Sequence, residues 1–277
     1  MAASRISIFG LGYVGAVSAA CLARDGHTVI GVDPNQTKVD LINQGKSPIV
    51  EHGLDELIRS GVAGGRLSAV TDAATAVSGS DISFVCVGTP SAANGSLDLR
   101  YVQAVCEEIG GVLKDLNRPH TVVIRSTILP GTMQSVVLPA LRQSSGREPG
   151  TDFAVLNNPE FLREGTAVND YFNPPKTVIG ALHPDNARSL ELVYADLPGP
   201  KITTSLETAE LVKYVDNVWH ALKVGFANEV GAICKQLNID SHPLMDIFCQ
   251  DRKLNISPTY LKPGFAFGGS CLPKDVR

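Results

Sequence analysis

The sequence predicts an α/β fold, in which a mainly parallel sheet with helices on both faces is followed by a long central helix and a small helical region. Over roughly the first 200 residues, short apolar, β-branched runs alternate with helical patterns. These runs are apolar on both faces, as in a parallel sheet that helices cover on both sides. Residues 207–237 contain no proline, which favours one long helix.

The elements follow one another in a simple order. The expected strands occupy residues 5–9, 28–32, 82–87 and 121–125, with edge strands of the same sheet at 153–156 and 177–179. The expected helices occupy residues 13–24, 99–116, 132–142, 207–237 and 243–249. The glycine-rich segment 264–271 is expected to be a loop, and Pro273 suits the first turn of a further helix.

Composition excludes several classes of protein. The 277 residues are 44% hydrophobic and 19% charged, with a net charge of −4, which excludes global disorder and gives no electrostatic attraction to nucleic acid. No stretch is long and apolar enough to predict membrane insertion. The 6 cysteines form no CxxC pair, which is typical of reduced thiols in the cytoplasm. The 6 histidines show no HxH or HExxH spacing, so no metal site is expected.

A glycine motif lies between the first strand and the first helix. Gly10, Gly12 and Gly15 permit a tight turn, close approach of a pyrophosphate and close packing of the helix on the strand. The free N–H groups at the helix start attract phosphate. Asp33 ends the second strand about 20 residues on, where a carboxylate accepts hydrogen bonds from an adenosine ribose and repels a 2′-phosphate. The pattern is typical of a Rossmann-like domain that binds NAD rather than NADP. A glycine turn without a ligand is the alternative.

Two further strand ends carry polar residues. Segments 88–90 and 126–127 follow expected strands, and ligands bind beyond the carboxyl ends of parallel strands. Taken alone, each segment is more typical of a turn or a helix cap than of a ligand contact.

The long helix carries a narrow polar stripe. Lys213, Asn217, His220 and Asn228 fall within an arc of about 80° at 100° per residue. Apolar residues fill most of the remaining surface, which predicts a largely buried helix. The stripe is then either part of a polar site or the solvent-exposed face of the helix, and its low charge favours a site.

One cysteine differs from the others in its surroundings. Cys271 follows two glycines and a serine, and it precedes a lysine at an expected helix start. A helix N-terminus and a nearby lysine both lower a thiol pKa. The residue is therefore a candidate nucleophile, with a small buried side chain as the alternative.

Several of these motifs occur together in one known family. The segments concerned are 8–15, 87–90, 158–164, 217–221 and 267–275. With them the chain resembles the UDP-glucose/GDP-mannose dehydrogenase family over residues 4–277. Segments 217–221 and 249–255 resemble the GDP-mannose branch more than the UDP-glucose branch.

The resemblance implies a reaction. The family oxidises a primary alcohol to a carboxylate in two hydride transfers to NAD, and its GDP-mannose branch makes GDP-mannuronate, a precursor of alginate. Cys271 would trap the C6 aldehyde as a thiohemiacetal, which becomes a thioester and is hydrolysed. Lys213 and Asn217 would stabilise the oxyanion. Glu160 would assist hydrolysis, and Asp275 and Thr127 would handle water and protons.

The resemblance also implies binding residues. The implied cofactor contacts are Gly10, Gly12, Tyr13, Val14, Gly15, Asp33, Lys38, Thr89, Thr127 and Lys274. The implied sugar-nucleotide contacts are Glu164, Lys213, Asn217, His220, Asn228, Tyr260, Lys262, Phe265 and Gly268. The chain departs from the pattern at Thr259, where an aromatic residue is expected, and at Lys262, where an arginine is expected. Lysine keeps the charge but loses the planar fork that binds phosphate.

We therefore expect an NAD-binding domain over residues 1–203 and a helical catalytic and dimerisation region over 204–277. The family has a downstream nucleotide-sugar domain that this sequence does not contain. The expected partner is GDP-mannose or another nucleotide sugar, and the long helix favours a homodimer. Three alternatives remain: a UDP-sugar dehydrogenase of the same mechanism, a two-electron hydroxyacid dehydrogenase, and a binding module without turnover.

Overall fold

The computed structural model describes residues 3–252, 264, 269 and 274. The chain divides into two compact units. The sheet unit comprises residues 1–92 and 96–211, and the helical unit comprises residues 93–95 and 212–277.

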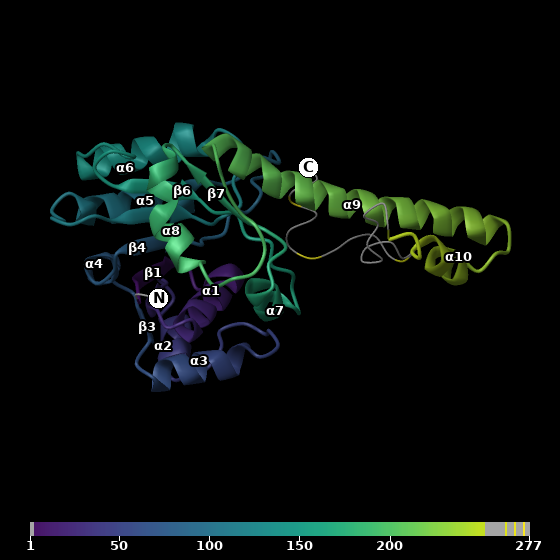
Figure 1. Ribbon diagram of the computed structural model, residues 1–277, viewed down its shortest axis with the longest axis horizontal. Coiled ribbons are helices and arrows are strands. Elements are labelled where there is room, and N and C mark those ends of the chain that lie inside the picture. The colour runs from purple at the N-terminus through teal and green to yellow at the C-terminus, as the bar shows by residue number, and fades with distance from the viewer. Residues whose placement is uncertain (1–2, 253–263, 265–268, 270–273, 275–277) are drawn as a thin grey trace. The chain divides into compact units, whose positions relative to one another are not determined.

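The sheet unit is built on an eight-stranded sheet in the order β3-β2-β1-β4-β5-β6-β7-β8 (Figure 1). Its strands are β1 (Arg5–Phe9), β2 (Thr28–Val32), β3 (Leu67–Val70), β4 (Ile82–Val85), β5 (Thr121–Ile124), β6 (Ala154–Asn157), β7 (Thr177–Ala181) and β8 (Lys201–Thr204). Every neighbouring pair is parallel except β6 and β7. The predicted mainly parallel sheet is confirmed. The two edge strands, β3 and β8, were not predicted.

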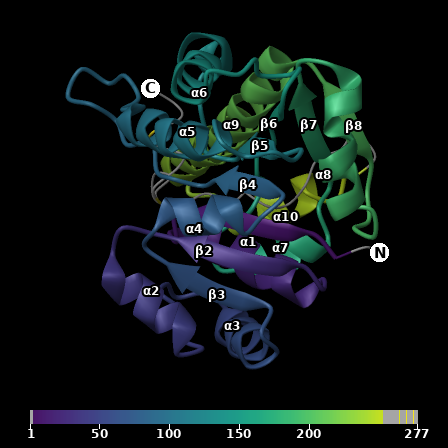
Figure 2. The ribbon, with the colours of Figure 1, turned by 90° about the vertical axis from the view of Figure 1, so that its left-hand side faces the viewer.

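Helices cover both faces of this sheet (Figure 2). They are α1 (Tyr13–Arg24), α2 (Gln36–Asn43), α3 (Leu54–Ala63), α4 (Ala73–Ser78), α5 (Arg100–Leu113), α6 (Leu138–Ser145), α7 (Ala167–Phe172) and α8 (Arg188–Val193). The helix predicted at 132–142 differs in detail, because a π-helical turn over Met133–Val137 precedes α6. Pro139 has no N–H to donate and lies in the first turn of α6, so the regular helix begins there.

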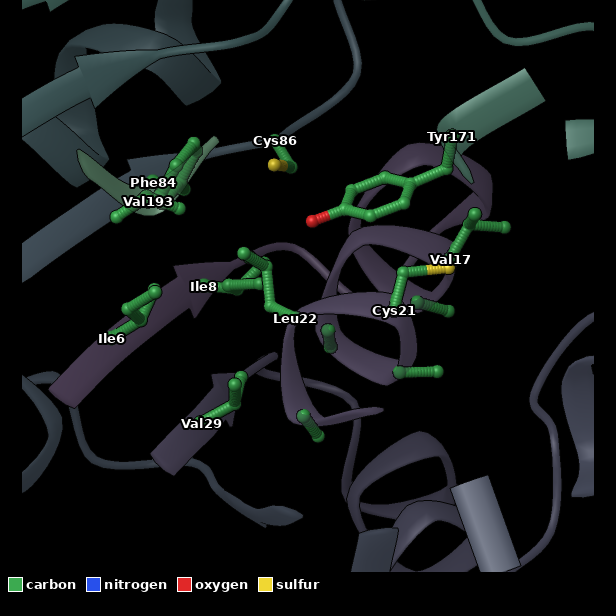
Figure 3. Close-up of a cluster of buried hydrophobic side chains, with 14 of the residues drawn as sticks. Ile6, Ile8, Val17, Cys21, Leu22, Val29, Phe84, Cys86, Tyr171 and Val193 are labelled. Carbon is green, nitrogen blue, oxygen red and sulfur yellow. The ribbon is translucent and has the colours of Figure 1, made fainter. Parts of the chain in front are cut away.

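The strand register sorts the core into two layers. Ile8, Phe84, Val123 and Leu156 lie side by side across β1, β4, β5 and β6, and they pack with α1 in one cluster. Figure 3 shows Val17, Cys21 and Leu22 of α1 in this cluster. The next residues along these strands point to the opposite face and pack with α4, α5 and α6. Because both faces are buried, the strands are mostly apolar on both sides, as the sequence predicts.

The helical unit contains most of α9 (Leu206–Gln236) and all of α10 (Ser241–Phe248), so the predicted long helix is confirmed. Asp240 caps α10 by accepting a hydrogen bond from the His242 N–H. Ala227, Met245 and Cys249 form a small core between the two helices. Among the residues that the structure describes, no helix is both long and apolar enough to cross a bilayer.

The exposure of the residues on the two faces of α9 differs from the prediction. Leu211, Val215, Val218 and Leu222 share an arc of about 60° and are 46–60% exposed, so the prediction of a largely buried helix is wrong for this face. Lys213 and Asn217 lie on the polar stripe and are each only 6% exposed. The reading of the stripe as a solvent-exposed face is therefore wrong for these two residues. The apolar face is the one that water reaches.

A chain of polar side chains crosses the core of the sheet unit. The Ser80 hydroxyl donates to Ser7 Oγ, the Ser7 and Ser83 hydroxyls are 2.8 Å apart, and Ser83 Oγ lies 2.8 Å from His120 Nε2. All four residues are buried. Burial, with a smaller contribution from the charge of Arg118, lowers the pKa of His120 to about 4. The ring is therefore neutral in the folded protein at neutral pH.

This histidine makes stability depend on pH. The unfolded chain binds a proton at His120 below about pH 6.5, whereas the folded protein does so only near pH 4, so stability falls as the pH falls between these values. We expect proton binding at His120 in the unfolded chain to lower the free energy of unfolding by about 3 kcal/mol as the pH falls from about 6.5 to about 4. Urea unfolding of the protein and of His120→Gln at several pH values measures the difference. Equal pH dependence in the two proteins would show that the ring titrates normally.

Candidate active site

The carboxyl ends of four neighbouring strands form one edge of the sheet unit. Hydrogen bonds tie the segments after β1, β2 and β4 together: the Gly10 N–H donates to Val32 O (2.7 Å), and the Cys86 N–H donates to Phe9 O (2.8 Å). The strand β5 joins this edge through the Ser126 hydroxyl, which donates to Val87 O (2.6 Å). Hydrogen bonds to main-chain oxygens therefore fix the segments of this edge relative to one another within the protein itself.

Each glycine of the motif meets a different constraint. Gly10 has a φ of +94°, in the left-handed region that favours glycine. A Cβ at Gly15 would lie 1.7 Å from the Gly10 carbonyl oxygen, so only glycine lets α1 pack this closely on the turn. A Cβ at Gly12 would meet nothing within 4 Å. The space in front of Gly12, at the start of α1, is thus open to a phosphate, and the residues present fit a dinucleotide.

Asp33 links the glycine turn to the end of β2. Its Oδ2 accepts hydrogen bonds from the Leu11 N–H (2.8 Å) and the Lys38 ammonium (3.0 Å), and its Oδ1 accepts from the Asn35 N–H (3.0 Å). The carboxylate is 5% exposed. It is the group expected to accept hydrogen bonds from a ribose, and the structure places it and Lys38 beside the turn as the sequence predicts.

The two polar strand ends lie together. The Thr89 hydroxyl donates to the main-chain oxygen of Thr127 (2.8 Å), which joins the segments that follow β4 and β5. Glu160 follows β6, is buried, and accepts a hydrogen bond from the Leu162 N–H (2.6 Å). Of the residues proposed for catalysis, the sheet unit thus brings Thr127 and Glu160 to the same edge as the glycine turn.

Glu51 is a site residue that the sequence analysis missed. Its carboxylate accepts hydrogen bonds from the Tyr13 hydroxyl, the Gly165 N–H (2.8 Å) and the Ala167 N–H (3.1 Å). Burial, and then the hydrogen bond to Glu51, raise the pKa of Tyr13. Glu51 therefore ties the start of α1 to the loop that carries Glu164. No sequence motif marked it, because Tyr13 lies 38 residues away and Gly165 and Ala167 lie more than 100 residues away.

The helical unit carries the other described candidates. Lys213, Asn217, His220 and Asn228 lie along one side of α9, the first two buried and the others partly buried. The Asn228 side chain accepts a hydrogen bond from the Gly264 N–H (2.8 Å), so it holds the start of the glycine-rich segment. Lys274 is partly buried. The predicted residues outside the described part of the chain are Thr259, Tyr260, Lys262, Phe265, Gly268, Cys271 and Asp275.

The other cysteines lack the properties of a nucleophile. Cys21, Cys86, Cys106, Cys234 and Cys249 are buried free thiols. Burial raises the pKa of Cys86 and of Cys106 to about 12, so both are neutral at physiological pH. In the described part of the chain, no group of His, Cys, Asp and Glu side chains could hold a metal ion.

A large hollow of about 740 Å³ lies away from this edge, at the amino ends of β5 and β6. Two of its cations have structural roles. Arg118 donates to Asp81 and to the carbonyls of Val77 and Ser78 at the end of α4, while Arg147 donates to the carbonyls of Leu113 and Leu116 at the end of α5. Because these arginines cap helices, we place the candidate site at the carboxyl edge instead.

Comparison with known proteins identifies the family of both parts of the chain. Residues 4–198 match the NAD binding domain of the UDP-glucose/GDP-mannose dehydrogenase family, and residues 207–277 match its central domain. The chain belongs to this family. The carboxyl edge therefore lies within the family's NAD binding domain, and α9 belongs to the central domain.

Individual relatives are similar over nearly the whole chain. The GDP-mannose 6-dehydrogenase of Pseudomonas putida is 58% identical over 99% of the chain, and the UDP-glucose 6-dehydrogenase of Haloferax volcanii is 38% identical over 98%. A ternary complex of GDP-mannose dehydrogenase from Pseudomonas aeruginosa matches with a TM-score of 0.89, covering 98% of this chain and 62% of that one. The chain spans 62–63% of the length of the two curated relatives.

The contrast between Gly12 and Gly15 can be tested in this NAD-binding unit. Gly12→Ala adds a methyl group to the open space, so we expect unfolding free energy to change by at most about 1 kcal/mol and NAD affinity to fall at least about tenfold. Gly15→Ala forces the turn apart and should cost more than about 2 kcal/mol of stability. Urea unfolding and calorimetric titration with NAD measure both effects. Unchanged NAD affinity in Gly12→Ala would contradict the placement of the phosphates.

Proposed function

We propose that this chain forms the NAD-binding and central parts of a cytoplasmic GDP-mannose 6-dehydrogenase, which oxidises C6 of GDP-mannose to the carboxylate of GDP-mannuronate, an alginate precursor. The choice of GDP-mannose as the substrate rests on sequence identity, which is 58% to a GDP-mannose 6-dehydrogenase and 38% to a UDP-glucose 6-dehydrogenase. The glycine turn and Asp33 support the cofactor, because they leave room for a pyrophosphate and offer a carboxylate to a ribose.

The cofactor site is assigned to residues at the carboxyl edge. Gly10, Gly12, Tyr13, Val14 and Gly15 would hold the pyrophosphate. The remaining proposed contacts are Asp33, Lys38, Thr89, Thr127 and Lys274. When bound, NAD supplies the hydride acceptor for both oxidations, so two NADH form for each sugar.

The proposed covalent chemistry takes place at Cys271. Its thiolate adds to the C6 aldehyde, and the developing oxyanion is stabilised by the Lys213 ammonium and the Asn217 amide. Burial of Lys213 and Asn217 supports this role, since a charge–oxyanion interaction is stronger away from water. After the second oxidation, the sulfur carries a thioester.

Hydrolysis of the thioester completes the reaction. Glu160 accepts a proton from the attacking water as the C–O bond forms, and the C–S bond breaks to release the Cys271 thiolate. Thr127 and Asp275 are proposed to order this water and its protons. The proposed sugar-nucleotide contacts are Glu164, Lys213, Asn217, His220, Asn228, Tyr260, Lys262, Phe265 and Gly268.

We also propose that two copies associate through the exposed apolar face of α9. Leu211, Val215, Val218, Leu222 and Phe226 are 45–60% exposed and share one stripe of the helix. A contiguous apolar stripe of this kind is typical of an interface rather than of a solvent-exposed surface.

A UDP-sugar is the second candidate substrate. A UDP-glucose dehydrogenase from Pyrobaculum islandicum matches with a TM-score of 0.93 at 42% identity, so the backbone suits either nucleotide. Lys262 also lacks the planar fork that an arginine would offer to a phosphate.

The proposed function is tested by NADH formation. We expect the intact protein to reduce two NAD for each GDP-mannose and to use UDP-glucose at least about a hundredfold less well in kcat/KM. Cys271→Ser should lower steady turnover by about three orders of magnitude and leave NAD binding intact. A preference for UDP-glucose would contradict the proposed substrate. A Cys271→Ser variant that keeps more than about a tenth of the unsubstituted protein's steady turnover would contradict covalent catalysis at this cysteine.

A further inference from the structure

A buried arginine lies behind the candidate site. Arg125 directly follows β5 and is 6% exposed. Its Nη1 donates hydrogen bonds to Asn158 Oδ1 (2.5 Å) and to the Tyr194 hydroxyl (3.2 Å), which in turn donates to Asn158 Oδ1 (2.9 Å). Its Nε has no hydrogen-bond partner among the described residues. The guanidinium is therefore bound by neutral groups, although burying a charge without a carboxylate partner is costly.

The neighbours of Arg125 show which charge offsets this cost. The groups that interact with it electrostatically are Tyr194, Cys86, Glu160 and Tyr171. Burial raises the pKa of both tyrosines, and it raises the pKa of Cys86 to about 12, so these three are neutral near pH 7. Figure 3 shows Cys86 and Tyr171 within the same cluster. Of these four groups, Glu160 is the acidic one, and it is buried beside Arg125 in the same cavity.

The same network also fixes the main chain that leads to Glu160. The Asn158 N–H donates to Ile124 O (2.8 Å), and its side-chain amide donates to Val178 O (2.8 Å), so β5, β6 and β7 all hold this residue. Pro159 restricts the backbone that follows. Glu160, Arg125, Tyr171 and Tyr194 line one small cavity with Lys176 and Asp170. Lys176 lies over the Phe161 ring, and Asp170 is paired with Arg163.

We infer that Arg125 is a positioning residue that, with Asn158 and Tyr194, fixes Glu160 in place to accept the proton of the hydrolytic water. This inference rests on the proposed function. Arg125 itself touches neither sugar nor cofactor in this account. Its effect falls on the hydrolysis step and not on the first oxidation.

Arg125→Met removes the charge and keeps most of the side-chain volume. We expect the first turnover to release its two NADH at a rate within about threefold of the unsubstituted protein, while steady turnover falls about tenfold or more and the thioester adduct accumulates. Arg125→Lys should restore most of the steady turnover, because it restores the charge.

Two comparisons separate this role from a structural one. Arg118→Met removes a half-buried helix cap at the other end of the strands, and it should lower stability without slowing steady turnover more than the first turnover. In the Glu160→Gln background, Arg125→Met should add less than about a twofold further loss, because the two residues act on one step.

The possible failures are distinguishable. If the unsubstituted protein does not reduce NAD with GDP-mannose, the proposed function fails, and the inference fails with it. If Glu160→Gln hydrolyses the thioester normally, the role proposed for Glu160 fails, and so does the inference, whatever the substrate. If the unsubstituted protein and Glu160→Gln behave as proposed, two results would overturn the inference alone. One is that Arg125→Met slows the first turnover and the steady turnover equally. The other is that Arg125→Met lowers the steady turnover of Glu160→Gln by as large a factor as it lowers that of the unsubstituted protein.

Discussion

The hydrogen bond from the Leu11 N–H to the Asp33 carboxylate is the contact on which the candidate site depends (2.8 Å). It joins the glycine turn after β1 to the end of β2, and it is possible because these strands are parallel neighbours in register. The same carboxylate binds Lys38 and the Asn35 N–H, so one buried side chain orders three segments. The open space at Gly12 and the close packing at Gly15 both require this turn to keep its position.

The sheet places further polar groups at the same edge for the same reason. Parallel strands end together, so Thr89, Thr127 and Glu160 come from distant parts of the sequence to one region of the sheet unit. The buried Arg125 contributes a positive charge behind them, and neutral partners hold it in place. In the helical unit, the distribution of residues on α9 has a different origin. Lys213 and Asn217 of its polar stripe are buried, whereas Leu211, Val215, Val218 and Leu222 on its apolar face are exposed.

The sequence predicts those features that arise from local patterns. The strands β1, β2, β4 and β5 are short runs rich in apolar and β-branched residues, and the glycine turn and Asp33 follow a known spacing, so all of these were found. The edge strands β3 and β8 were missed because Leu-Ser-Ala-Val and Lys-Ile-Thr-Thr are short and partly polar. Glu51 and Arg125 were missed as site residues because their roles come from tertiary contacts alone. The exposure of the apolar face of α9 also could not be read from periodicity, which identifies a face but not its neighbour.

The central claim, that Asp33 both holds the glycine turn and selects the cofactor, is tested most directly by calorimetric titration of the protein with NAD and with NADP. The carboxylate accepts hydrogen bonds from a ribose but repels a 2′-phosphate, so we expect NAD to bind at least about tenfold more tightly. Asp33→Ala should narrow the difference between the two affinities, chiefly by weakening the binding of NAD. Equal affinity for the two cofactors in the unsubstituted protein would contradict the account.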